Sequence, residues 1–209
     1  MKILIHSIIL VIVLNISVYS QTNGTTAVKK TNSWAIGFQY SDNGYGFSGT
    51  YYQKLSRITD MMYKLSFTGI SDPSEVQYYD YYTGETVVKD KINRIYAMTL
   101  NVGIKHNIFF DDIDGNFKPF VKVGVAPTLI MMTPYDRGFF NAFGYAQTSY
   151  AIGPYAGIGI EYYESKSIGL SIGVEYSYLP VIGRDVSSIL NKNITDVGGL
   201  QFSFNFMFL

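Results

Sequence analysis

The sequence predicts an all-β protein, an eight-stranded antiparallel up-and-down transmembrane β-barrel spanning residues 34–209. The first observation is that apolar and polar residues alternate through eight segments, which is the period of a strand because successive side chains point to opposite faces. The second is that large side chains collect on one face of each segment, and small or charged ones on the other. The third is an export signal at the N-terminus.

The closing segment, residues 200–208, shows the alternation most clearly. Gln201, Ser203 and Asn205 share one face, and the opposite face holds Leu200 and a stripe of phenylalanines: Phe202, Phe204, Phe206 and Phe208. An unpaired edge strand with such a stripe would make a soluble protein aggregate. The stripe suits a strand that closes a barrel and faces lipid, where every backbone polar group must be paired within the protein.

The other seven segments are separated by turns of unequal length. They are predicted at residues 34–40, 45–51, 61–68, 96–105, 118–129, 152–162 and 168–178. Ser41–Gly44 carries the Asn-Gly signal of a tight hairpin. Short turns are also expected at 56–60, 111–116 and 164–167, and long connections at 71–93, 133–149 and 179–196. Short turns at one rim and longer loops at the other are typical of an outer-membrane barrel.

The size of the side chains decides which face points outward. The interior of an eight-stranded barrel is only wide enough for side chains to fill it. The Trp, Phe, Tyr, Ile, Leu and Met residues of the large face cannot all fit inside, whereas the Gly, Ala, Ser and Thr residues of the other face can. We therefore expect the apolar face to contact lipid. A secreted, soluble, ligand-binding barrel is the alternative that the alternation alone leaves open.

Residues 1–20 have the pattern of a signal peptide. Lys2 precedes an apolar run from Ile3 to Leu14, and Val18-Tyr19-Ser20 supplies a cleavage site before Gln21. The run is shorter than the roughly 20 apolar residues that a membrane-spanning helix needs. Residues 21–33 are expected to form a flexible lead. The chain has no Cys, which excludes a lipid-anchored cysteine and disulfides.

Composition and motifs point away from nucleic acid, metal and enzyme chemistry. Cleavage of the signal would leave 15 basic and 16 acidic residues, so the chain lacks the excess of basic residues that is typical of nucleic-acid-binding proteins. Asp112-Ile-Asp114-Gly115 has Val121 where a calcium loop needs Glu. His106, the one His left after cleavage, is expected to point outward near the inner rim. We therefore expect no cofactor, no metal and no enzymatic activity.

Several stretches resemble the outer-membrane β-barrel domain family of small porin-like or OmpA-like barrels. They are Lys118–Val125, Pro154–Tyr162, Leu170–Tyr178 and the Phe-striped end. The resemblance covers about Trp34 to Leu209. It implies location in the bacterial outer membrane, contact with outer-membrane lipid and recognition of the last strand by the barrel-assembly machinery. Chains of this family usually end in an aromatic residue, whereas here Phe208 is penultimate.

Six charged residues fall on the predicted inward face: Lys64, Lys105, Lys118, Lys122, Glu161 and Glu175. Buried charges are very costly unless they are paired. We therefore expect a lumenal salt-bridge network that fills the barrel. A path for protons or ions, as in a narrow porin for small solutes, is the alternative interpretation.

The long connections hold the candidate contact residues for an extracellular ligand. Tyr78, Tyr79, Tyr81 and Tyr82 flank a turn signal in the longest loop, which is expected to form an extended hairpin. Tyr offers contact area at low entropic cost, so these residues could bind a partner. Phe139 and Phe140 in the next loop, with Phe143 and Tyr145, could join them. The sequence thus predicts a structural or surface-interaction membrane protein.

Overall fold

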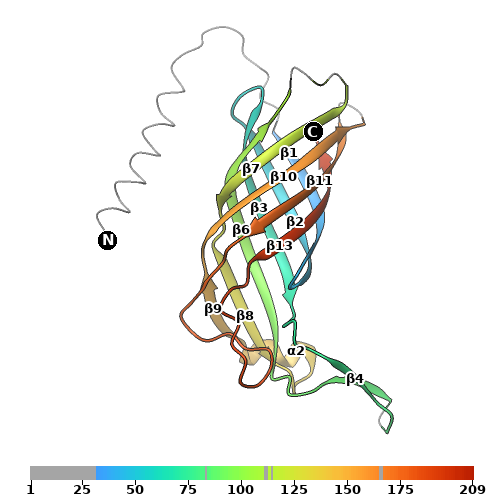
Figure 1. The fold of residues 1–209 in the computed structure, drawn as a ribbon, viewed down its shortest axis with the longest axis vertical. Helices are drawn as coiled ribbons and strands as arrows, with labels where there is room; N and C mark the ends of the chain where they lie inside the picture. Colours follow the sequence, from blue (N-terminus) through green and yellow to red (C-terminus); the bar gives the residue numbers. More distant parts are fainter. Residues whose placement is uncertain (1–31, 83, 111–112, 114, 165–166) are drawn as a thin grey trace, which may run out of the picture.

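The computed structural model describes residues 32–209, apart from residues 83, 111–112, 114 and 165–166. The expected signal peptide lies outside the described residues. Eleven strands form one antiparallel sheet that closes on itself (Figure 1). They are β1 (Ser33–Ser41), β2 (Gly44–Lys54), β3 (Thr59–Ile70), β6 (Asn93–Asn107), β7 (Phe117–Val125), β8 (Thr128–Pro134), β9 (Gln147–Ala151), β10 (Pro154–Tyr163), β11 (Ile168–Ser177), β12 (Val181–Ile182) and β13 (Gly199–Phe208).

The first and last strands pair and close the barrel. In the β1–β13 register Trp34 lies opposite Phe208 and Ser41 lies opposite Gln201. Three pairs of strands (β7 with β8, β9 with β10, β11 with β12) each follow one another along a single barrel strand, so the eleven segments make an eight-stranded barrel. The predicted fold class is therefore confirmed.

The three interrupted barrel strands break side by side, and each break contains or precedes a proline. The breaks lie at 126–127, 152–153 and 178–180, beside Pro127, Pro154 and Pro180. Proline has no N–H to donate to a neighbouring strand. The Ala126 N–H instead bonds the Gly153 carbonyl at 2.9 Å, which joins the first two breaks. The expectation of unbroken strands at 118–129 and 152–162 was wrong at these prolines.

Exposure follows the predicted alternation in every barrel strand. On β13, Phe204 is 38% exposed, whereas Ser203 and Asn205 are each 6% exposed. Trp34 on β1 and Phe47 on β2 are 61% and 67% exposed. A closed barrel with an apolar belt outside and polar side chains inside is the plan of outer-membrane proteins. The fold is accordingly that of a transmembrane barrel of the outer-membrane type.

The two rims differ. Of the described residues, the short-turn rim carries 55–58, 108–110, 113, 115–116, 164 and 167, and the C-terminus lies there (Figure 1). The long-loop rim carries the connections 71–92, 135–146 and 183–198, and its one tight turn joins β1 to β2. At this rim a hairpin of β4 (Gln77–Asp80) and β5 (Glu85–Val88) projects away from the barrel. The rim also holds α2 (Phe139–Ala142) and the 3-10 turn η1 (Phe143–Tyr145).

Within the described part of the chain, no helix has the length and apolar character needed to cross a membrane.

The phenylalanine stripe of β13 allows a test of which face of the strand points to lipid. Phe204→Asp places a carboxylate on the lipid-facing wall at the middle of the strand and should lower the free energy of unfolding by about 2–4 kcal/mol or somewhat less. Phe204→Leu keeps an apolar side chain there and should have a much smaller effect. Urea titration of the protein refolded into lipid vesicles measures both. Equal effects of the two substitutions would contradict the outward assignment of Phe204.

Candidate functional site: the lumen and the long-loop rim

The centre of the lumen holds an ion-pair cluster built from three barrel strands. Glu175 on β11 accepts from Lys64 on β3 at 2.6 Å and pairs with Lys122 on β7 at 2.5 Å. These three side chains are between 2% and 6% exposed. Alternation on each strand points them inward, and the narrow interior brings them together. Asn101 also donates to Glu175, at 3.5 Å.

A second cluster lies nearer the short-turn rim and is centred on Lys105. Its ammonium is 2.5 Å from Glu161 and 3.0 Å from Asp60, and it lies 4.6 Å from the centroid of the Tyr52 ring. Asp60 also pairs with Lys54 at 3.3 Å. In this cluster two carboxylates face two ammonium groups, whereas in the first cluster a single carboxylate faces two.

Five of the six inward charges expected from the sequence therefore meet in these clusters. Lys118 lies elsewhere: its ammonium donates to the backbone carbonyls of Phe110 and Ile113 and sits 4.5 Å from the centroid of the Phe110 ring. Sequence reasoning missed Asp60, which it assigned to the turn at 56–60. The signal was available, because Asp60 precedes Lys64 by an even number of residues on one strand and so shares its face.

Large side chains fill space that the glycines leave in the lumen. Tyr155 and Met207 are 2% and 1% exposed, and Phe120 is 4% exposed. A Cβ on Gly159 would overlap the Phe120 ring, so the ring occupies the space that the missing side chain leaves. The middle of the lumen is thus packed and charge-paired, whereas a cavity of about 390 Å³ lined by Lys54, Asp60 and Lys105 lies at its short-turn end.

His106 lies outward on β6 near the short-turn rim, as its parity predicted. Its Nδ1 is 2.9 Å from the Thr59 hydroxyl on β3. The described geometry gives this side chain a cross-strand structural contact.

A folded segment, residues 183–197, packs on inward apolar residues of the barrel at the long-loop rim; we call it the cap segment. Val186 and Ile189 of this segment are 0% and 8% exposed. Val186 belongs to an apolar cluster with Ile95 and Ile130 from the barrel strands. The cap segment is tied to the start of β6, where the backbone N–H of Ile92 donates to the Ser188 carbonyl at 2.8 Å. Sequence reasoning treated this region as an irregular loop.

Glu75 ties three loop segments together at this rim. Its carboxylate accepts from the Ser188 hydroxyl at 2.5 Å and pairs with Lys91 at 2.5 Å, and it also accepts from the Asp72 backbone N–H at 3.1 Å. Burial raises the pKa of the Glu75 carboxyl, but the hydrogen bonds from Lys91 and Ser188 lower it more, so the pKa lies below its ordinary value of 4.5. Glu75 is therefore ionised at neutral pH.

Beyond this tie, the tyrosine segment forms the extended hairpin expected from the sequence. β4 and β5 pair from Gln77 opposite Val88 to Asp80 opposite Glu85. The side chains of Tyr79, Tyr81 and Tyr82 are 68%, 88% and 98% exposed, and Tyr78 is 53% exposed.

Phe139 and Phe140 lie in a different setting, on α2 beside the outer wall of the barrel. The Phe139 ring centroid is 6.4 Å from that of Tyr96, an outward residue of β6, and Phe143 stacks on the same tyrosine at 5.9 Å. Phe140 contacts Phe139 edge to face and is 86% exposed. Their described partners are thus aromatic residues of the loop and the barrel exterior.

No family model matches the chain, and no curated protein matches it. Among solved structures, Neisserial surface protein A is similar with a TM-score of 0.49 and 11% identity, covering 85% of this chain and 92% of that one. The attachment invasion locus protein Ail of Yersinia pestis has a TM-score of 0.46 and 11% identity, covering 87% and 100% of the two chains. The N-terminal β-barrel domain of Pseudomonas aeruginosa OprF has a TM-score of 0.43 and 13% identity, covering 86% and 98%.

The two charge clusters should respond differently to loss of an acid. Glu175→Gln leaves Lys64 and Lys122 facing each other without a carboxylate, and should lower the free energy of unfolding by about 3–5 kcal/mol. Glu161→Gln should cost less, because Lys105 keeps Asp60. Urea titration of the refolded protein in lipid vesicles measures both.

A triple variant serves as the control for that comparison. Replacing Lys64 and Lys122 by Met together with Glu175→Leu removes all three charges, and should restore most of the stability lost in Glu175→Gln. The original protein should also show little steady conductance in a planar bilayer, because buried ion pairs and packed side chains occupy the middle of its lumen. Equal losses for Glu175→Gln and Glu161→Gln would contradict the assignment of partners.

The Glu75 tie should depend on pH. Because its folded pKa lies below the unfolded value, the tie is fully present above about pH 4.5 and is lost as the pH falls through the folded pKa. A spin label on Cys introduced at Lys192 in the cap segment should therefore gain mobility on acidification. In Glu75→Gln the label should already be mobile at neutral pH and respond little to acid. A label whose mobility is the same at every pH in both proteins would contradict the tie.

Proposed function

We propose that the protein is a surface-interaction protein of the outer membrane that contacts an extracellular partner through hairpin β4–β5, on a barrel whose lumen is filled. The observation that carries this proposal is the group of highly exposed tyrosines on a hairpin that projects beyond the long-loop rim (Figure 1). Tyrosine combines a large apolar surface with a hydroxyl, and it loses little conformational entropy on binding. Such rings exposed on a short hairpin are suited to contact with another molecule.

The orientation follows from the unequal rims. Small barrels of the outer membrane carry short turns on the periplasmic side and longer loops outside the cell. The unequal rims therefore support an orientation with the hairpin, α2 and the cap segment outside the cell and the C-terminus in the periplasm. The barrel-assembly machinery would then meet β13 with its phenylalanine stripe from the periplasmic side.

Contacts of Glu75 with Lys91 and Ser188 hold the base of the hairpin against the rest of the rim. Glu75 precedes β4 and Lys91 follows β5, and their ion pair joins the two ends of the projecting segment. Ser188 adds a contact to the cap segment, which packs on the barrel core. A fixed base reduces the entropy lost when the tip binds a partner.

The filled lumen argues against a channel. Glu175 with its two lysines occupies the centre, and Val186 and Val197 of the cap segment pack on inward apolar residues at the outer end. The belt of exposed aromatic residues argues against a soluble secreted barrel, since Phe47 and Trp34 would meet water there.

A labelling and adhesion experiment tests the proposal. The chain has no Cys, so Tyr82→Cys gives a single thiol at the hairpin and Ser56→Cys gives a matched one at the short-turn rim. A membrane-impermeant maleimide added to whole cells should label the first and spare the second. Replacing Tyr79, Tyr81 and Tyr82 together by Ser should weaken adhesion to the surface that the cells bind by about tenfold or more, since hot-spot residues each cost more than about 1 kcal/mol.

Adhesion should be scored on immobilised polysaccharides, matrix proteins and bacterial cells, against cells that lack the protein. Replacing half-buried Ser187 and exposed Lys192 and Asn193 of the cap segment by Ala changes polar residues at the same rim and should leave adhesion unchanged. Labelling of Ser56→Cys instead of Tyr82→Cys would reverse the orientation. Full adhesion by the triple Tyr variant, or no adhesion to any surface, would refute the role of the hairpin.

A further inference from the structure

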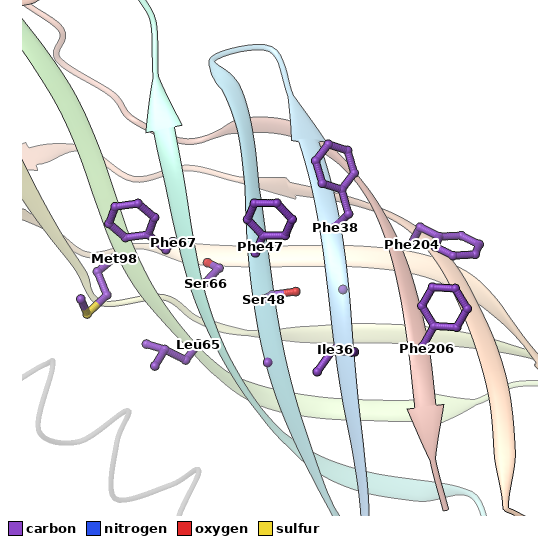
Figure 2. A pocket seen from close by; sticks show the side chains of 12 residues that line it. Ile36, Phe38, Phe47, Ser48, Leu65, Ser66, Phe67, Met98, Phe204 and Phe206 are labelled. Carbon is purple, nitrogen blue, oxygen red and sulfur yellow. The ribbon is translucent and has the colours of Figure 1, made fainter. Parts of the chain in front are cut away.

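The outer wall of the barrel carries an apolar groove that is unrelated to the lumen and the hairpin. It has a volume of about 480 Å³ and is formed by β13, β1, β2, β3 and β6. Figure 2 shows Phe38 and Phe47 beside each other on β1 and β2, with Phe67 and Met98 on one side and Phe206 on the other. The volume lies in the range of about 300–1,000 Å³ that is usual for small-ligand pockets.

The groove exists because one outward position lacks a side chain. Gly49 on β2 lies between Ile36 on β1 and Leu65 on β3 in the strand register. Its neighbours on the same face of β2 are the large residues Phe47 and Tyr51. A Cβ built on Gly49 would have no atom within 4 Å, so no packing requirement of the barrel keeps this position small.

An aromatic cluster links the groove to the long-loop rim. Phe67, which lines the groove, stacks on Tyr96 with ring centroids 5.6 Å apart. Tyr96 in turn stacks on Phe143, which follows α2. Aromatic rings between the apolar wall and the rim of a barrel are typical of the boundary between lipid and water.

Two arginines lie directly beyond these rings. Arg94 precedes Tyr96 by two residues on β6; its Nη1 donates to the carbonyls of Pro134 at 3.1 Å and Arg137 at 3.2 Å. Its guanidinium lies 4.6 Å from the centroid of the Tyr135 ring, and that of Arg137 lies 3.7 Å from the centroid of Tyr145. Within the described part of the chain, no carboxylate forms an ion pair with either arginine. Asp136, between Tyr135 and Arg137, adds one exposed negative charge.

We propose that this outer wall binds one phosphorylated glycolipid of the outer leaflet, with its phosphate-bearing headgroup at Arg94 and Arg137 and an acyl chain in the groove at Gly49. The guanidinium group suits phosphate because its planar donors can bind two oxygens together, and stacking on tyrosine holds it in place. The order of charges, aromatic rings and apolar groove matches the order of headgroup, interface and acyl chain in such a lipid. The inference rests on the orientation proposed above but not on the role of hairpin β4–β5.

Lipid binding to the purified, detergent-solubilised protein can be measured by native mass spectrometry. The probes are lipid A, lipid A without its phosphates, and zwitterionic phosphatidylcholine. We expect one lipid A to bind, and the dephosphorylated form to bind at least about fivefold more weakly, as expected for loss of a charged contact at a lipid surface. This comparison uses the unmodified protein, so it remains decisive even if a variant fails to fold.

Substitutions separate the headgroup contact from the groove. Arg94→Gln and Arg137→Gln should each weaken lipid A binding by about fivefold, whereas Arg184→Gln, at an exposed position of the cap segment, should not. Asp136→Asn should strengthen it. Gly49→Leu fills the groove and should weaken lipid A and dephosphorylated lipid A alike, whereas Ala156→Leu on the outward face of β10 should affect neither. Heat-dependent gel mobility checks that each variant folds.

Three results would each overturn the proposal. The first is equal binding of lipid A and phosphatidylcholine to the unmodified protein. The second is lipid A affinity in Arg94→Gln and Arg137→Gln equal to that in Arg184→Gln. The third is an effect of Gly49→Leu no larger than that of Ala156→Leu.

Discussion

The pairing of β1 with β13 is the constraint on which the rest of the structure depends. In lipid, each unpaired backbone N–H or carbonyl costs several kcal/mol, so a sheet that crosses a membrane must close. Closure after eight barrel strands then fixes the width of the interior. That width determines which residues fit inside, and alternation assigns every other residue to the outside. The charged lumen and the apolar belt are two consequences of the same closed sheet.

A lumen of this width turns inward charges into buried ion pairs. Removing ions from water is expensive, and an ion pair offsets that cost only when its geometry is good, so such pairs are weak evidence of stability. They do distinguish one register from another, because a slip of one residue would move Lys64 or Glu175 into lipid. Lys64 and Glu175 lie 111 residues apart in sequence and meet only when the barrel has closed correctly. We interpret the clusters as a device that favours this register.

Alternation predicted the eight barrel strands, the outward phenylalanine stripe and five of the residues in the charge clusters, because these depend only on the period of a strand and the size of side chains. The breaks beside Pro127, Pro154 and Pro180 were readable in principle, since proline lacks the N–H that a central strand donates. Asp60 was missed because it was assigned to the turn at 56–60, although it lies an even number of residues from Lys64 and so shares its inward face. The cap segment could not be predicted, because its packing depends on contacts between segments far apart in sequence. Nor could the groove at Gly49, which is defined by neighbours on other strands.

At the long-loop rim the Tyr135 ring contacts one cation from the loops and one from the outer wall of the barrel. Lys91, the partner of Glu75, lies 5.4 Å from the centroid of Tyr135, and Arg94 lies 4.6 Å from the same centroid. Lys91 belongs to the tie that holds the hairpin and the cap segment, whereas Arg94 faces the outer wall above the groove. Cation–π contacts of this kind are each worth about 0.5–1 kcal/mol at exposed sites. The loops are thus held by the barrel core on one side and by the membrane-facing wall on the other. Tyr135 contacts residues of both sets.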